Sequence, residues 1–119
     1  MRKALWFLLA LILLTPAYAS APSKCLFVWA GDDHKKASDF LAVLDADPAS
    51  SRYGQVIASV AVPGPTGTPH HTELEMPSGG FLLANAFESG RTLLFDLREP
   101  RTPRLVTSFG DIDGYMHPH

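Results

Sequence analysis

Short apolar or alternating runs separated by turn residues dominate the chain beyond its first two dozen positions. The runs are bounded by Gly, Pro, Asp, Asn or Ser, a pattern typical of β-strands. They cover residues 26–30, 40–44, 55–62, 81–85, 93–95 and 105–109. No segment after the N-terminus carries a sustained period near 3.6 residues, which a surface helix would need. The sequence therefore predicts an all-β fold.

The polar segments between these runs predict tight connections. Residues 31–36, 78–80 and 88–91 are expected to be loops of hairpins. Asp45–Pro48 and Asp96–Pro100 follow strands at matching points and are expected to be turns, with proline presetting the backbone. The pair Asp45 and Asp47 could start a calcium loop, but the later oxygen ligands and the closing glutamate are missing. The turn interpretation is therefore favoured.

Two similar segments follow one another along the chain. The second predicts an antiparallel four-stranded meander over 71–75, 81–87, 92–97 and 104–109, and the first corresponds to its last three strands. Asp45 and Asp96 are 51 residues apart, and His70 and His117 are 47 apart. A four-stranded repeat near 50 residues predicts the blades of a β-propeller. About one and three-quarter blades are expected in residues 20–119, and because such repeats need about three neighbours, we expect this to be the N-terminal portion of a longer domain.

The N-terminus predicts an export signal over residues 1–19. Arg2 and Lys3 precede an apolar run over 4–14, and small residues stand at Ala17 and Ala19, where a signal peptidase reads. Eleven apolar residues fall short of the ~20 that span a bilayer. We therefore expect a periplasmic or secreted protein that leaves the membrane after cleavage.

Composition and charge exclude few classes of binding partner. The formal net charge is −2, and losing Arg2 and Lys3 with the signal makes it −4. The four arginines between Arg91 and Arg104 are interleaved with Glu99 and prolines, so no nucleic-acid surface is expected. Cys25 is the single cysteine, so an internal disulfide is excluded. We interpret Cys25 as a small apolar residue that leads into a strand.

Histidines carry the candidate chemistry. Two pairs, His70 with His71 and His117 with His119, stand at equivalent points of the two segments, so both pairs should face a shared axis. Imidazoles without thiolates favour copper, zinc, iron or nickel over calcium and magnesium. Residues two apart on a strand share a face, so His117 and His119 could face the same side, whereas neighbours such as His70 and His71 would point to opposite faces. Both members of the first pair could bind one ion only if the backbone bends at Pro69.

Other polar residues have supporting or neutral interpretations. Glu73 and Asp113 are candidates for orienting an imidazole through its second nitrogen. His34 lies in a charged hairpin and is expected to be solvated. The alternative for the four paired histidines is that they are polar residues at the blade ends, bonded to backbone. The repeat register favours a metal site.

The chain resembles the selenium-binding protein / methanethiol oxidase family. The resemblance is carried by residues 40–57, by Pro69-His-His-Thr-Glu73 and by Arg101-Thr-Pro-Arg-Leu105. It implies a seven-bladed propeller of over four hundred residues. It also implies copper-dependent oxidation of methanethiol by O2 to formaldehyde, hydrogen sulfide and hydrogen peroxide. Within it, His70 and His71 match the family's double histidine, and His117 and His119 match its next histidine cluster.

One departure separates this chain from the animal selenium-binding members. They carry a cysteine just before Gln-Val-Ile, where this chain has Gly54. Covalent selenium binding at that position is therefore excluded. The segment Met116-His-Pro-His119 resembles the corresponding segment of bacterial members of the family. The sequence leads to two hypotheses: a copper-dependent oxidase of a small thiol, or a non-catalytic exported propeller that binds a selenium or thiol compound or a protein partner.

Overall fold

The described residues form seven β-strands. The computed structural model describes residues 24–64, 66–110 and 112–115. Its strands are β1 (Cys25–Ala30), β2 (Phe40–Asp45), β3 (Val56–Ala61), β4 (Pro69–Thr72), β5 (Phe81–Ala86), β6 (Arg91–Asp96) and β7 (Arg104–Phe109). The predicted all-β class is confirmed. Within the described ranges, no helix is long and apolar enough to cross a membrane.

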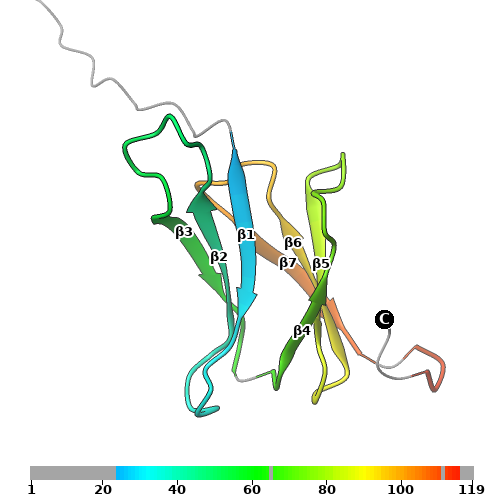
Figure 1. Cartoon of the computed structure of the whole chain (residues 1–119). Helices are drawn as coiled ribbons and strands as arrows, with labels where there is room; N and C mark the ends of the chain where they lie inside the picture. The colour runs from blue at the N-terminus through cyan, green and yellow to red at the C-terminus, as the bar shows by residue number, and fades with distance from the viewer. Residues whose placement is uncertain (1–23, 65, 111, 116–119) are drawn as a thin grey trace, which may run out of the picture.

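The strands form two antiparallel sheets, each a simple meander (Figure 1). The first sheet has the order β1-β2-β3 and the second the order β4-β5-β6-β7. A three-stranded and a four-stranded meander fit the incomplete and the complete propeller blade that the repeat predicts. The predicted export signal, residues 1–19, lies outside the described residues.

One predicted strand is wrong in its bounds. We expected the first strand of the second copy at 71–75, but β4 begins at Pro69 and ends at Thr72. Leu74 completed the alternating pattern in the sequence, yet its side chain is 100% exposed. No apolar contact therefore holds residues 73–75 against the sheet, and pairing with β5 ends at Thr72 opposite Ala84.

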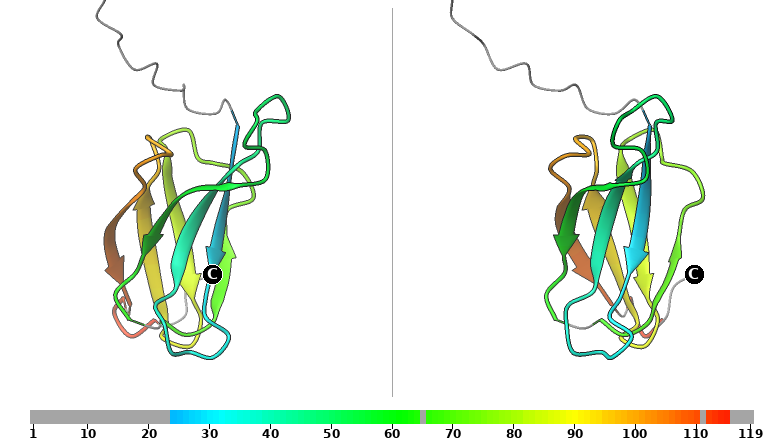
Figure 2. Two further views of the ribbon diagram at one scale, coloured as in Figure 1. Left: turned by 90° about the vertical axis from the view of Figure 1, so that its left-hand side faces the viewer. Right: turned by 60° about the vertical axis from the view of Figure 1, so that its left-hand side comes forward.

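The two sheets pack face to face, the first lying over the second in Figure 2. The core between them comes from β2, β5, β6 and the segments that follow β3 and β6; its buried members are Leu41, Val62, Leu82, Ala84, Ala86, Leu93, Phe95 and Leu97. Along β5 the buried residues alternate with Phe81, Leu83 and Asn85, which therefore point away from the first sheet. Each sheet thus has one face in the core and one face turned outward.

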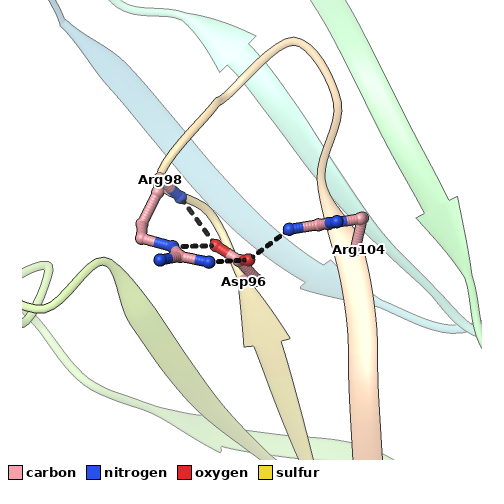
Figure 3. A network of polar contacts seen from close by, with 3 residues as sticks. All are labelled: Asp96, Arg98 and Arg104. Atoms are coloured by element: carbon pink, nitrogen blue, oxygen red, sulfur yellow. Dashed lines mark hydrogen bonds and ion pairs between the residues drawn. The ribbon is translucent and has the colours of Figure 1, made fainter.

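The turns after β2 and β6 are held by equivalent aspartates, as the sequence predicts. The Asp45 carboxylate accepts hydrogen bonds from Asp47 N (3.0 Å) and Ser50 Oγ (2.6 Å). Asp96, 5% exposed, accepts from Arg98 N, Nε and Nη2 and from Arg104 Nη2 (Figure 3). Hydrogen bonds from Arg98, and then from Arg104, hold the pKa of the Asp96 carboxyl well below its ordinary range against the effect of burial.

Candidate metal centre

The double histidine lies on the edge strand of the second sheet. His70 and His71 are the middle residues of β4, and both are exposed. Their ring centroids are 4.0 Å apart with an interplanar angle of 83°. The two imidazoles therefore stand edge to face, although neighbouring side chains of a regular strand would point to opposite faces.

A β-bulge explains this arrangement. Pro69 pairs with Ala86 and Thr72 pairs with Ala84, so two residues of β4 face the single residue Asn85 of β5. A bulge of this kind re-aims the side chains of the longer strand. The backbone irregularity that the sequence required at Pro69, if both rings were to serve one ion, is thus present.

The two rings have different surroundings. His70 packs against the ring of Phe87, with 5.1 Å between centroids and 41° between planes. His71 borders an outward-facing cavity of about 340 Å³, whose other lining residues are Thr72, Glu73, Leu83, Asn85, Thr92 and Phe109. Glu73, a predicted partner of an imidazole, therefore lies at the same cavity as His71. Asp113 lies apart, in the turn from Ile112 to Tyr115 with φ of 52°.

A buried carboxylate anchors the loop that leads to β4. Asp39 is 3% exposed and accepts hydrogen bonds from Thr66 N (2.9 Å) and Thr66 Oγ1, while its carbonyl accepts from Val62 N. Gly31 allows the close approach, because a Cβ there would lie 2.6 Å from Asp39 Oδ1 and 2.8 Å from the Pro69 ring. Sequence reasoning missed Asp39, since a lone aspartate before a strand is an ordinary turn residue.

A second anchor joins the loop to both sheets. Glu88 Oε1 accepts hydrogen bonds from Lys35 Nζ (2.6 Å), in the β1–β2 hairpin, and from Thr68 Oγ1 (3.0 Å). These two donors, Lys35 first, lower the pKa of the Glu88 carboxyl. The carbonyl of Thr68 in turn accepts from Phe87 N at 2.9 Å. The position of the double histidine is therefore fixed from both sheets.

Two other candidates are accounted for by the local structure. His34 is exposed in its hairpin, where the Asp32 carboxylate accepts hydrogen bonds from the backbone N–H groups of His34, Lys36 and Ala37. Cys25 is half-buried at the start of β1, and burial raises the pKa of its thiol above the usual range. A raised pKa disfavours the thiolate that metal binding needs.

The chemistry of the donor set fits copper. Two adjacent imidazoles at an exposed strand edge are nitrogen ligands of the kind that copper binds well. Among the described residues, no group of three or more His, Cys, Asp or Glu side chains comes together around one point. His117 and His119, the other predicted ligands, lie outside the described residues. An ion held by His70 and His71 would take its remaining ligands from beyond the described part of the chain or from solvent.

Comparison with known proteins supports the family resemblance. No protein-family model matches the chain. Over 114 residues the chain is 33% identical to the methanethiol oxidase of a Hyphomicrobium species, covering 88% of this chain and 25% of that protein. It thus spans about a quarter of the length of this relative. The crystal structure of a hypothetical selenium-binding protein from Sulfolobus tokodaii has a TM-score of 0.61 at 22% identity, covering 76% of this chain and 23% of that one.

The structural likeness establishes the fold, and the sequence match extends over the strands that carry the bulge and its anchors. The names of both relatives agree with the family that the sequence resembles. The sequence match to a methanethiol oxidase thus supports the resemblance of this chain to the selenium-binding protein / methanethiol oxidase family, and the fold agrees with it.

Proposed function

We propose that the protein is an exported, copper-dependent oxidase of a small thiol. The observation that carries the proposal is the bulge on β4, which places the imidazoles of His70 and His71 side by side. The relative named methanethiol oxidase supports the reaction class. The N-terminal signal pattern supports export.

In the proposed reaction, methanethiol, O2 and water yield formaldehyde, hydrogen sulfide and hydrogen peroxide. The carbon loses two electrons, which O2 takes up with two protons to form the peroxide. Copper, when bound, would supply a Lewis acid for the thiol sulfur and a centre for electron transfer. The protein's part is to present neutral imidazole nitrogens and to keep them in place.

The residues around the double histidine are suited to holding its imidazoles in place. Phe87 packs against the His70 ring and restricts its rotation on that side. The Asp39–Thr66 and Glu88–Thr68 hydrogen bonds fix the loop before β4. Ligands held by packed and hydrogen-bonded neighbours lose less freedom when the ion binds.

Metal analysis of the full-length protein tests the proposal. Wild type is expected to hold copper in a fixed ratio to protein and to release peroxide when methanethiol is added. The double variant His70→Ala/His71→Ala should lose both. His34→Ala, which removes an exposed histidine from the β1–β2 hairpin, is the matched control and should keep both. Stoichiometric copper in the double variant would overturn the ligand assignment.

The cavity beside His71 favours a second candidate function. About 340 Å³ lined by both polar and apolar side chains could hold a small thiol or selenium compound without turnover. This candidate predicts ligand binding that does not depend on copper and no release of peroxide. The same peroxide measurement therefore separates the two.

A further inference from the structure

Trp29 and Asn85 occupy the same position in the two sheets. Cys25 pairs with Asp45 in the first sheet and Phe81 pairs with Asp96 in the second, and both registers continue without a shift. Trp29 therefore pairs with Leu41 where Asn85 pairs with Thr92. The repeat thus replaces an apolar pair by a polar one at a single row of the sheet.

The apolar pair of the first sheet fills the space between the sheets. Leu41 is fully buried, and the Trp29 ring lies 5.9 Å from the ring of Phe95. In the second sheet the equivalent side chains are smaller and leave the cavity that His71 borders. Side chains of the size of Trp29 and Leu41 at these positions would fill that cavity. The polar pair instead leaves it open and places a carboxamide beside His71.

The polar pair of Asn85 and Thr92 is held in place at Thr92, its buried member. Thr92, 4% exposed, lies with Oγ1 3.4 Å from Asn85 Oδ1. The backbone of Asn85 is held as well, because its carbonyl accepts a hydrogen bond from Trp29 Nε1 at 3.0 Å. The carboxamide is thus fixed opposite the two residues of the bulge, and both Asn85 and His71 line the cavity.

We infer that Asn85 is a positioning residue for the double histidine, and the inference rests on the proposed function. The Asn85 carboxamide oxygen accepts the N–H of one imidazole, that of His71, while Thr92 donates to the same oxygen, since a carbonyl oxygen has two lone pairs. The hydrogen bond selects one tautomer of His71 and leaves the other ring nitrogen for the metal. Partners of this kind typically contribute 10–100-fold to metal affinity.

Two variants of the full-length protein test the inference. Asn85→Leu removes the acceptor at similar size, and Asn85→Asp restores an acceptor. Phe81→Leu, an apolar change on the same outward face of β5 but outside the cavity lining, is the matched control. Copper(II) affinity is measured by competition with a chelator, and the tautomer of His71 is read from ¹H–¹⁵N correlation spectra of metal-free protein labelled with ¹⁵N-histidine.

Asn85→Leu is expected to weaken copper(II) binding by about 10–100-fold and to mix the tautomers of His71. Asn85→Asp and Phe81→Leu should keep one tautomer and an affinity close to that of wild type. A His71 spectrum unchanged by Asn85→Leu would overturn the inference, even if copper still depends on His70 and His71. If wild type binds no copper, the proposed function fails, and the tautomer measurement alone decides whether Asn85 orients the ring.

Discussion

Trp29 donates a hydrogen bond from its indole Nε1 to the backbone carbonyl of Asn85, 3.0 Å away and 56 residues later in the chain. The bond joins β1 of the first sheet to β5 of the second at the residue that faces the bulge. The bond therefore links the packing of the two sheets to the strand that pairs with the double histidine.

Trp29→Phe tests this link in the full-length protein. The variant keeps a ring for packing against Phe95 and removes the N–H donor together with part of the bulk of the indole. Loss of one partly buried hydrogen bond is expected to lower the free energy of unfolding in urea by about 1 kcal/mol. Exchange of the amide protons of His70 and His71 should quicken. Trp29→Ala, which also removes the ring, should cost about 3–5 kcal/mol, and equal losses in the two variants would contradict a separate role for the indole N–H.

Periodicity predicts the strands well because the core itself imposes it. Leu82, Ala84 and Ala86 point inward at every second position, and such alternation is visible in the sequence. The predicted bounds of this strand, 71–75, were wrong because the apolar residue Leu74 is fully exposed and is not packed in the core. An alternating pattern records which residues are apolar but not whether they are buried.

The candidate site could be predicted only in its residue types. The pairing of His70 with His71 is evident in the sequence, but the bulge that brings the rings together depends on the register with β5. The anchoring roles of Asp39 and Glu88 depend on residues 27 and 20 positions away, respectively. No local pattern marks such long-range hydrogen bonds.

Asp39→Ala is expected to loosen the loop before β4. The change leaves the N–H of Thr66, a buried residue, without its acceptor, which costs about 1–3 kcal/mol in the free energy of unfolding. Copper affinity should fall as the double histidine loses its anchor. Urea unfolding and chelator competition measure the two effects. Asp33→Ala, in the exposed hairpin nearby, is the control and should leave both unchanged.

Stability is expected to fall in acid through Asp96. Its pKa is lower in the folded protein than in the unfolded chain, where an aspartate titrates near 4. The unfolded state therefore binds the proton first, so the stabilisation is complete above about pH 4 and is lost progressively as the pH falls further. Asp96→Asn should be less stable than wild type at pH 7 and should approach it at pH 3. The same difference at both pH values, measured by urea unfolding, would rule out this origin.

Gly67 and Gly64 form a matched pair that tests how tightly the loop before β4 is packed. Both have positive φ, 91° and 72°, so alanine at either position carries a similar backbone penalty of about 1–2 kcal/mol. A Cβ at Gly67 would lie 2.5 Å from Glu88 Cβ, whereas a Cβ at Gly64 would meet nothing within 4 Å.

Gly67→Ala should therefore destabilise the protein more than Gly64→Ala does. It must also displace Glu88, whose carboxylate holds Thr68 two residues before His70, so copper affinity should fall in this variant alone. Urea unfolding gives the difference in stability, and chelator competition gives the difference in affinity. Equal affinities in the two variants would show that the double histidine keeps its geometry without the Glu88 anchor, and rigidity at β4 would then have to come from the bulge and the Trp29–Asn85 hydrogen bond.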